Sequence, residues 1–454
     1  MVNAIFQEYG SRILNYSGKT LLIIILVWII TILALKRRTL REVIFDCLKF
    51  LKRIATFLTF RICTLVLLVF LCVFFSRDVE HRFHVRKFLS QTDSPFVAQN
   101  YAALNPSAIV HTDGRKRNLI VIMLESMETG FRDAAVYGEN LIPELEAIEK
   151  EGLPLKGYRK TPGGYFTIDG MSAQLLGMPL MQLPTDIHDV GKNKLFGSFL
   201  SRVPGIFNVL KNDGYMTAGF LGTSKEYTHM GDFLRVHGIS EGFFAEDWER
   251  LGYPLTDSNR GRWDYSDDFL FARFEEWLSK PKNSSFAAFI GTIDTHFPVG
   301  FTPVTERVKG NHQESVRHAS RLVGRFLTWA KTQPWYKDTT IYIAGDHQWQ
   351  DFEYAFTKLT KKDTNRGIYS VFLNSARTDL RIRSCGFSAM DIAPTILNAM
   401  GIDFTSDFHG QPSHIKLGLG QSLFADGENL VCRYGVNELT QKLREYSAFY
   451  NTLQ

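Results

Sequence analysis

Two long apolar runs stand out in the first 76 residues of the chain. Residues 20–35 (TLLIIILVWIITILAL) carry no charge, and residues 63–75 (CTLVLLVFLCVFF) follow shortly after Arg61. With its flanks, each run approaches the roughly 20 residues that a helix needs to cross a bilayer. Arg61 shortens the second run, which could also be a buried core helix, but two such runs so close together favour a transmembrane pair. We therefore expect residues 1–76 to form a membrane anchor with two transmembrane helices.

The segment between these runs is strongly basic. Residues 36–53 contain seven Lys or Arg and two acidic residues. Such a segment could be a solvated or amphipathic surface helix, but between two spans it is typical of a cytoplasmic loop. Both chain ends would then lie outside the cytoplasm, with the large domain on the periplasmic or extracellular side of the inner membrane. A cleaved signal peptide fits poorly, because a basic cluster and not a small-residue cleavage site follows the first run.

The pattern changes again after the anchor. Residues 77–116 are polar and mixed, which we interpret as a linker or a membrane-surface segment. From residue 117 to 454, short β-rich apolar runs alternate with helix-like segments. The expected strands are 118–124, 215–223, 286–294, 339–346 and 369–375, and the expected helices include 142–152, 268–280 and 391–401. This alternation predicts an α/β domain with a mainly parallel sheet and helices on both faces.

Charge and cysteine content narrow the classes of function. The net charge of the chain is +5, which equals the net charge of residues 36–53 alone, so the remainder is balanced. No basic stripe is left for nucleic acid, and we expect no nucleic-acid partner. Of the five cysteines, Cys385 and Cys432 fall in the predicted large domain, where they could form a disulfide in an oxidising compartment. Spacing alone leaves their pairing open, and the lack of a CxxC motif argues against a structural zinc site.

The predicted strands end in unusually polar residues. Three of them run into Glu125-Ser126, Asp294-Thr295-His296 and Asp346-His347. Each group alone could simply cap a strand. Because the carboxyl ends of parallel strands meet at one edge of a sheet, we expect the groups to lie together. Carboxylates with an imidazole suit a divalent cation, either Mn²⁺ or Mg²⁺ at an oxygen-rich site or Zn²⁺ given His347.

Thr167 lies in the stretch TPGGYFTIDGM, residues 161–171, at an expected helix start. It could be an ordinary helix cap. It could also be a nucleophile, which requires activation by a base or a metal. The helix N-terminus would favour an alkoxide or a bound phosphate, and Gly163 and Gly164 would let a substrate or metal approach the backbone. The stretch itself leaves both interpretations open, and the cation site predicted elsewhere favours the nucleophile.

Four motifs occur in an order that resembles a known family: IVIMLESMETGF, GGYFTIDGM, TIDTHFP and IAGDH. They are similar to the alkaline-phosphatase-like metalloenzymes, or sulfatase superfamily. Within it they look most like membrane-anchored phosphoglycerol and phosphoethanolamine transferases, of which glucan phosphoglycerol transferases and lipoteichoic acid synthases are the nearest groups. The resemblance covers residues 117–425 and implies an alkaline-phosphatase-like fold.

The resemblance also implies roles for individual residues. The implied metal ligands are Glu125, Thr167, Asp346 and His347. Thr167 would be the nucleophile that takes up the phosphoryl group, and His296 would contact the substrate phosphate or protonate a leaving oxygen. A headgroup, phosphoglycerol or phosphoethanolamine, would pass from a membrane phospholipid through phospho-Thr167 to a sugar hydroxyl of an envelope glycan or glycolipid. Two alternatives remain, a phosphodiesterase that releases the headgroup to water and a non-catalytic envelope protein that keeps the fold.

The chain also departs from the family pattern. Lipoteichoic acid synthases carry an arginine near the donor phosphate, where this chain has Met230. Lys225 or His229 would replace it, or the donor and acceptor contacts differ. A sulfatase would need Cys/Ser-x-Pro-x-Arg at the position of Thr167, and its absence argues against sulfatase activity.

An acidic segment beside a tryptophan is the candidate acceptor contact. We expect Trp263 and Asp264 to bind substrate, with Asp267 and Asp268 as further acceptor-side candidates. The alternative is that these residues form a helix N-terminus with solvated acids.

Overall fold

The computed structural model describes residues 93–180, 200–261, 263–296, 300–301, 312–349 and 366–453, together with Ile23. Apart from Ile23, both expected membrane spans lie outside these residues. Among the helices that the structure describes, none combines the length and the apolar composition that a bilayer crossing requires.

A seven-stranded sheet forms the centre of the described fold, in the order β3-β8-β7-β2-β6-β4-β5. Its strands are β2 (Asn118–Leu124), β3 (Leu153–Pro154), β4 (Met216–Leu221), β5 (Glu241–Phe243), β6 (Phe286–Gly291), β7 (Thr339–Gly345) and β8 (Ser370–Leu373). The five strands β7, β2, β6, β4 and β5 are parallel, whereas β8 pairs antiparallel with both β7 and β3. The sheet is therefore mixed and mostly parallel, and the expected strand at 369–375 is its antiparallel member.

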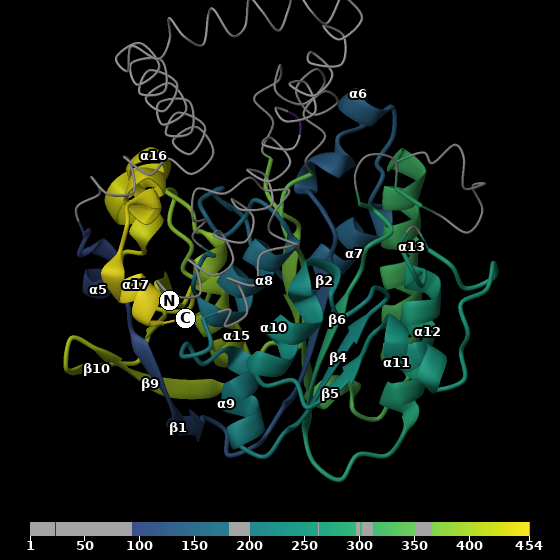
Figure 1. Cartoon of the computed structure of the whole chain (residues 1–454), viewed down its shortest axis with the longest axis horizontal. Coiled ribbons are helices and arrows are strands. Elements are labelled where there is room, and N and C mark those ends of the chain that lie inside the picture. Colours follow the sequence, from purple (N-terminus) through teal and green to yellow (C-terminus); the bar gives the residue numbers. More distant parts are fainter. Residues whose placement is uncertain are drawn as a thin grey trace, which may run out of the picture. The chain divides into compact units, whose positions relative to one another are not determined.

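Helices cover both faces of this sheet, as the alternating pattern predicts (Figure 1). Leu119 and Val121 of β2 belong to one apolar core, while Ile120 and Ile122 face the other. Among the helices that contribute to the first core are α8 (Thr167–Leu176), α9 (Ile206–Asn212), α10 (Met230–Val236) and α15 (Ile392–Ala399). Among those that contribute to the second are α7 (Pro143–Glu151), α11 (Ala245–Arg250), α12 (Asp267–Ser279) and α13 (His312–Ala330). Because β2 is apolar on both faces, it lies in the middle of the sandwich.

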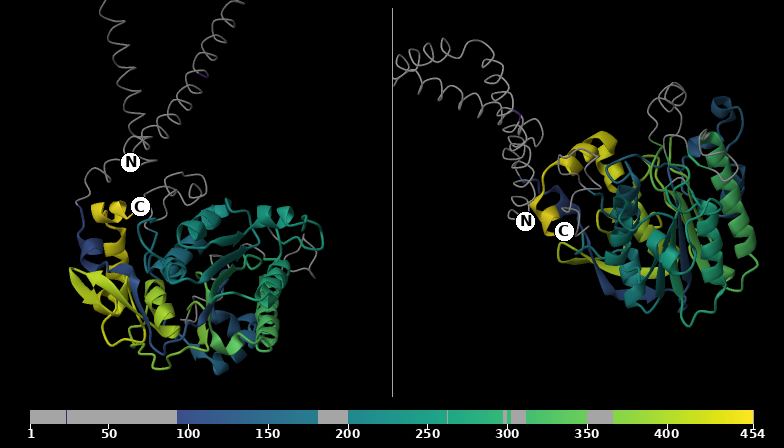
Figure 2. Two further views of the ribbon diagram at one scale, coloured as in Figure 1. Left: turned by 90° about the horizontal axis from the view of Figure 1, so that it is seen from below. Right: turned by 45° about the vertical axis from the view of Figure 1, so that its right-hand side comes forward.

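A second, antiparallel sheet joins distant parts of the chain. It has the order β1-β9-β10 and consists of β1 (Ala103–His111), β9 (Ile402–Phe408) and β10 (Gln411–Ser413). Both β1 and the preceding α5 (Phe96–Asn100) fall within the segment 77–116. The Phe96 ring of α5 lies 5.4 Å from that of Tyr434 in α16 (Leu430–Arg444). In Figure 2 the yellow C-terminal helices lie beside the blue α5.

Shorter elements complete the described fold. They are η1 (Thr129–Arg132), α6 (Ala134–Tyr137), η4 (Tyr227–His229), η5 (Tyr336–Asp338), η8 (Ala389–Asp391), β11 (Lys416–Leu417), β12 (Gly420–Gln421) and α17 (Ala448–Thr452).

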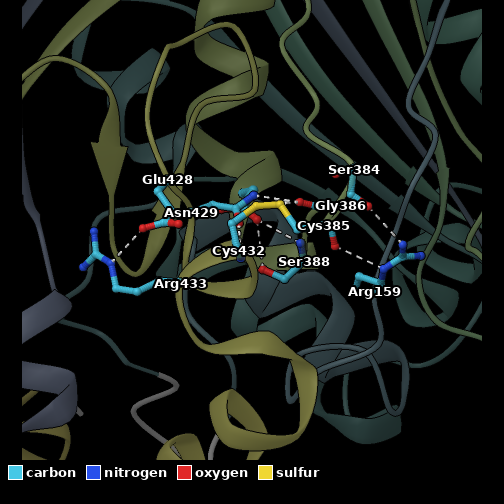
Figure 3. The surroundings of a disulfide bond; sticks show 10 residues. Arg159, Ser384, Cys385, Gly386, Ser388, Glu428, Asn429, Cys432 and Arg433 are labelled. Carbon is cyan, nitrogen blue, oxygen red and sulfur yellow. Dashed lines mark hydrogen bonds and ion pairs between the residues drawn. A yellow bond between two sulfur atoms is a disulfide. The ribbon is translucent and has the colours of Figure 1, made fainter.

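Cys385 and Cys432 form a disulfide, which answers the question that their spacing left open (Figure 3). Their Cα atoms are 5.2 Å apart, and the bond closes a loop across 47 residues. The Asn429 side chain accepts a hydrogen bond from the Cys432 backbone N–H at 2.9 Å and donates one to the Gly386 carbonyl at 3.0 Å. The bond therefore ties the first turn of α16 to the segment before α15.

Candidate active site

The site lies at the carboxyl ends of three neighbouring strands. In the sheet, β2 is between β7 and β6, and Leu124 of β2 is in register with Gly345 of β7. Glu125 follows β2 directly, and Asp346 and His347 follow β7. Thr295, in the segment after β6, donates its hydroxyl hydrogen to the Glu125 carbonyl at 2.6 Å. The expectation that the polar residues after these strands meet at one edge of the sheet is therefore confirmed.

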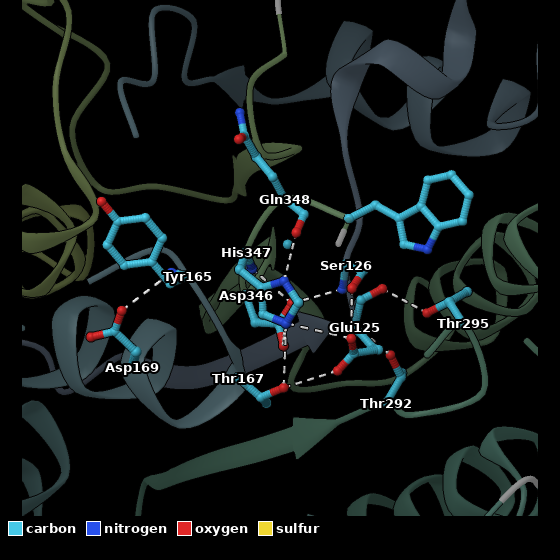
Figure 4. Close-up of polar contacts among 12 residues, drawn as sticks. Glu125, Ser126, Tyr165, Thr167, Asp169, Thr292, Thr295, Asp346, His347 and Gln348 are labelled. Atoms are coloured by element: carbon cyan, nitrogen blue, oxygen red, sulfur yellow. Dashed lines mark hydrogen bonds and ion pairs between the residues drawn. The ribbon is translucent and has the colours of Figure 1, made fainter. Parts of the chain in front are cut away.

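Glu125, Asp346 and His347 form a compact, buried cluster (Figure 4). Each offers one ligand atom, and these atoms lie within 4.8 Å of one another. The side chains are only 1%, 1% and 3% exposed, respectively. Nε2 of His347 is 3.5 Å from both Oε1 of Glu125 and Oδ2 of Asp346.

The Thr167 hydroxyl points into the same cluster. Its Oγ1 donates a hydrogen bond to Oε2 of Glu125 at 3.0 Å and lies 3.5 Å from Nε2 of His347. Figure 4 shows the four side chains converging from α8 and from the ends of β2 and β7. The structure thus brings together all four residues that the family resemblance implies as ligands.

The cluster carries more negative charge than buried groups tolerate alone. Burial raises the pKa of Asp346 to about 7, and the nearby charge of Glu125 adds to this effect. Burial also acts to raise the pKa of Glu125, but the charges of His347 and His296 hold it below its usual value. For His347, burial lowers the pKa, and the two carboxylates outweigh this and raise it. Two buried carboxylates beside one imidazole are a typical setting for a bound cation.

The donor set fits a divalent cation on local grounds as well. Among the described residues, Oδ2 of Asp346 is buried and has no hydrogen-bond partner. Nδ1 of His347 lies 2.7 Å from the Gln348 carbonyl. When Nδ1 carries the hydrogen of that bond, Nε2 presents its lone pair toward the carboxylates. Two carboxylates, one imidazole and one hydroxyl suit Mn²⁺, Mg²⁺ or Zn²⁺, and the donor set alone does not choose among them.

The position of Thr167 at the start of α8 excludes the interpretation of this residue as the helix cap. Phe166 occupies the N-cap position, and Thr167 is the first residue inside the helix. Its hydroxyl is directed at Glu125 and not at the backbone of its own first turn. Thr167 is therefore not the helix cap, and its hydroxyl is available to the cluster.

Asp169, which the sequence interpretation did not single out, holds the loop in front of Thr167. Its carboxylate accepts hydrogen bonds from the backbone N–H groups of Gly163, Tyr165 and Leu180, at 3.0, 3.2 and 3.0 Å. Burial raises the pKa of Asp169 to about 6, and the three backbone bonds oppose that rise. The side chain therefore ties the segment before α8 to the segment that follows this helix.

Glycines let α8 pack tightly at this point. A Cβ on Gly170 would lie 2.2 Å from the carbonyl oxygen of Asp346, so only glycine allows this approach. The sequence predicts that Gly163 and Gly164 let a substrate or metal approach the backbone. The structure gives another reason for these two glycines. A Cβ would lie 2.8 Å from the Ala173 Cβ at Gly163 and 2.2 Å from the Tyr158 hydroxyl at Gly164. The chain's own atoms already require these two glycines.

Ser126 is a second residue whose role the sequence did not reveal. Its φ of 53° lies in the left-handed region, which is unusual for a residue other than glycine. From this position its N–H donates to Oδ1 of Asp346 at 2.7 Å and its hydroxyl donates to Oε1 of Glu125 at 2.6 Å. The strained residue therefore links the two carboxylates.

His296 and Trp263 form a second group beside the cluster. The two ring centroids are 5.6 Å apart with an interplanar angle of 89°. His296 directly follows Thr295, whose hydroxyl donates a hydrogen bond to the Glu125 carbonyl at 2.6 Å, so this segment lies beside the cluster. His312, at the start of α13, was not predicted from the sequence. It stacks on Trp349 at 3.9 Å, and burial lowers the pKa of His312 to about 3, so its ring is neutral near pH 7.

The other predicted substrate contacts lie in the loops that flank Trp263. The N–H of Lys225 donates to Oε2 of Glu246 at 3.2 Å, and Nδ1 of His229 lies 3.4 Å from Oδ2 of Asp232. Asp264 accepts a hydrogen bond from the Ser224 N–H at 3.0 Å. Lys225, His229 and Asp264 are therefore each engaged in a contact within the protein.

Asp267 and Asp268 have structural partners at the start of α12. The carboxylate of Asp267 accepts the backbone N–H groups of Ile293 and Asp294, at 2.9 and 3.1 Å. Asp268 pairs with His318 and, at 2.8 Å, with Arg325. The helix N-terminus alternative therefore describes both residues, although Asp267 is only 2% exposed and is not solvated.

Comparison with known proteins supports the same fold. Phosphoglycerol transferase I of Salmonella arizonae is 29% identical over 301 residues, or 63% of this chain and 38% of that protein. The protein of that name from Salmonella newport is 29% identical over 300 residues, with the same coverage. This chain therefore spans well under half the length of these relatives. Lipoteichoic acid synthase LtaP of Listeria monocytogenes superposes with a TM-score of 0.52 at 16% identity, covering 74% of this chain and 81% of that one.

A second solved structure agrees with this result. A member of the alkaline phosphatase superfamily from Vibrio parahaemolyticus has a TM-score of 0.53 at 18% identity, covering 74% of this chain and 75% of that one. Both superpositions show the alkaline-phosphatase-like α/β fold. The family model for sulfatases matches residues 117–402, which include the whole cluster and His296. The resemblance read from the motifs is thus confirmed, and the chain belongs to the sulfatase family.

Proposed function

We propose that this protein transfers a phosphoglycerol or phosphoethanolamine headgroup from a membrane phospholipid to a sugar hydroxyl of an envelope glycan or glycolipid. The observation that carries the proposal is the Thr167 hydroxyl, 3.0 Å from Glu125 and 3.5 Å from His347. The relatives named phosphoglycerol transferase I support the choice of headgroup.

Glu125, Asp346 and His347, with the Thr167 oxygen, would hold the divalent cation. When bound, such an ion supplies Lewis-acid chemistry that favours an ionised hydroxyl and polarises phosphate oxygens. The chain's own contribution is placement. Asp169 and Gly170 fix the start of α8, and Ser126 orients the carboxylate of Glu125. Positioning and charge stabilisation supply most of the rate in phosphoryl transfer.

In the first half of the reaction, Oγ1 of Thr167 forms a bond to phosphorus, and the bond from phosphorus to the diacylglycerol oxygen breaks. The hydroxyl proton is directed at Oε2 of Glu125, its hydrogen-bond acceptor in the structure. His296 gives a proton to the departing diacylglycerol oxygen.

In the second half, a sugar hydroxyl loses its proton to His296 and attacks the phosphorus of phospho-Thr167. The Thr167–phosphorus bond breaks, and the threonine oxygen regains its proton from Oε2 of Glu125. The two halves together move one headgroup and restore the enzyme.

The compartment follows from the same proposal. The acyl chains of the donor stay in the bilayer, so we place the catalytic domain at the periplasmic or extracellular face of the inner membrane. The disulfide between Cys385 and Cys432 supports this placement, because such bonds persist in oxidising compartments.

The test uses the full chain with a labelled phospholipid and a sugar acceptor. Thr167→Ala is expected to abolish headgroup transfer, while Thr328→Ala, at an exposed threonine of α13, is expected to retain it. Circular dichroism checks that both variants fold. Undiminished transfer by the Thr167 variant would overturn the proposal, and headgroup release to water that a sugar never intercepts would favour the phosphodiesterase.

A further inference from the structure

Trp263 is partly exposed to solvent, although burying an aromatic ring is favourable. It is 41% exposed, and the other exposed large hydrophobic side chains among the described residues are Ile23, Val110 and Leu251. Of these four exposed residues, Trp263 is the aromatic one. Its ring meets the ring of His296 edge to face at 5.6 Å.

The loop that carries this indole is fixed by its neighbours. The Gly261 N–H donates to the Asp264 carbonyl at 2.8 Å, and the Tyr265 N–H donates to the Gly222 carbonyl at 2.9 Å. Tyr265 is buried, and its hydroxyl donates to the Tyr253 carbonyl at 2.6 Å. These contacts anchor the backbone on both sides of Trp263, which limits the ordering that ligand binding would require.

A second aromatic ring extends the surface. The Tyr227 ring lies 5.5 Å from that of Trp263, with an interplanar angle of 36°. Tyr227 begins η4, in which Thr228 and His229 have φ values of 45° and 56°. Two successive non-glycine residues in the left-handed region are strained, and such strain concentrates at binding and catalytic segments.

We propose that Trp263 and Tyr227 form a stacking platform for a pyranose ring of the acceptor, beside His296. This inference rests on the proposed transfer function. One face of a pyranose carries a patch of C–H groups, which pack on an aromatic face while the hydroxyls stay solvated or hydrogen-bonded. A sugar stacked on Trp263 would present a hydroxyl to His296, the residue proposed to take its proton.

The polar surroundings favour a sugar over a lipid chain. Asp264 follows Trp263 directly, and its carboxylate is held by the Ser224 N–H at 3.0 Å. The Ser224 hydroxyl in turn donates to Oε1 of Glu246 at 2.6 Å. Carboxylates and hydroxyls beside an aromatic face match the alternating apolar and polar edges of a sugar, whereas an acyl chain would require a wider apolar surface.

The experiment measures binding of soluble neutral oligosaccharides of glucose, galactose and N-acetylglucosamine to the metal-saturated full chain, by calorimetry and without phospholipid. For an oligosaccharide that binds the parent, Trp263→Ala is expected to weaken affinity at least about tenfold, as for aromatic side chains that become buried when a ligand binds. Trp263→Phe is expected to restore much of it. Leu251→Ala is the matched control, because Leu251 is also exposed, at 51%, and is expected to leave affinity unchanged.

The outcomes separate this inference from the function on which it rests. Equal sugar affinity in the parent and the Trp263→Ala variant, or no binding by the parent to any of the three oligosaccharides, would overturn the platform. Weaker binding of the Trp263 variant to phosphatidylglycerol vesicles with unchanged sugar affinity would also overturn it and assign the ring to the lipid. Transfer that depends on Thr167 but not on Trp263 would leave the proposed function standing without the platform.

Discussion

Replacing Gly170 by alanine tests how the fold positions Thr167. Alanine is favoured over glycine inside a helix by about 1 kcal/mol, so helix propensity alone predicts a more stable protein. The added Cβ would lie 2.2 Å from the Asp346 carbonyl oxygen. Non-bonded atoms are in ordinary contact at about 3.5 Å, so α8 and the end of β7 would have to separate by about 1 Å to accommodate the Cβ. Overpacking of this kind costs about 1–3 kcal/mol, which offsets the gain in propensity.

The larger effect falls on activity. A displacement of about 1 Å between a nucleophile and its partners can cost about 100-fold in rate. We expect Gly170→Ala to lower the transfer rate by about that factor while the unfolding free energy changes by less than about 2 kcal/mol. Steady-state transfer assays and urea denaturation measure the two quantities.

Gly324→Ala in α13 is the control for Gly170→Ala, because its Cβ would lie 3.0 Å from Cβ and Cγ of Glu144, a much smaller overlap than the 2.2 Å approach at Gly170. Gly324→Ala is expected to keep the rate of the parent. A Gly170→Ala variant that is more stable than the parent and equally active would refute the argument that α8 must touch the backbone at Asp346.

Three further predictions concern stability. Removal of the cation by a chelator should lower the midpoint of thermal unfolding in calorimetry, because the carboxylates of Glu125 and Asp346, each 1% exposed, would lose the charge that neutralises them. A midpoint that is unchanged by the chelator would contradict a metal site. Burial raises the pKa of Asp391 to about 6, so the folded state binds the extra proton and stability falls, by about 1.4 kcal/mol per pH unit, as pH rises from about 4 to about 6. Asp391→Asn removes this pH dependence, so the unfolding free energy of the variant relative to the parent should rise between about pH 4 and about pH 6. Unfolding free energies that change with pH in the same way in both proteins would contradict the raised pKa of Asp391. Replacing both Cys385 and Cys432 by serine should cost about 4 kcal/mol in denaturant unfolding, given the 47-residue loop, and a cost near zero would mean that native contacts alone hold α16 in place.

The sequence predicted those parts of the fold and site that depend on local pattern. Strands β2, β6 and β7 are buried and largely apolar runs, and the polar residues that directly follow β2 and β7 place Glu125, Asp346 and His347 at one edge of the sheet. The pairing of β1 with β9 joins residues about 300 positions apart, and no local signal specifies such a partner. The same limit applies to the packing of α8 on β7.

The residues that orient the cluster were missed for a related reason. Ser126 matters because of its left-handed backbone, and Asp169 matters because three backbone N–H groups converge on its carboxylate. Both properties arise only when distant segments come together. The sequence carries no distinctive signal for Asp169, because acidic residues are common in the first turn of a helix.

The central claim is that the Thr167 oxygen becomes covalently bonded to phosphorus during turnover. Mass spectrometry of the metal-loaded full chain, quenched after mixing with phosphatidylglycerol in the absence of an acceptor, tests it directly. The account predicts a phosphoglycerol adduct on the peptide that contains Thr167, which disappears when a sugar acceptor is added. An adduct on another residue, or continued headgroup transfer by the parent with no adduct at all, would contradict it.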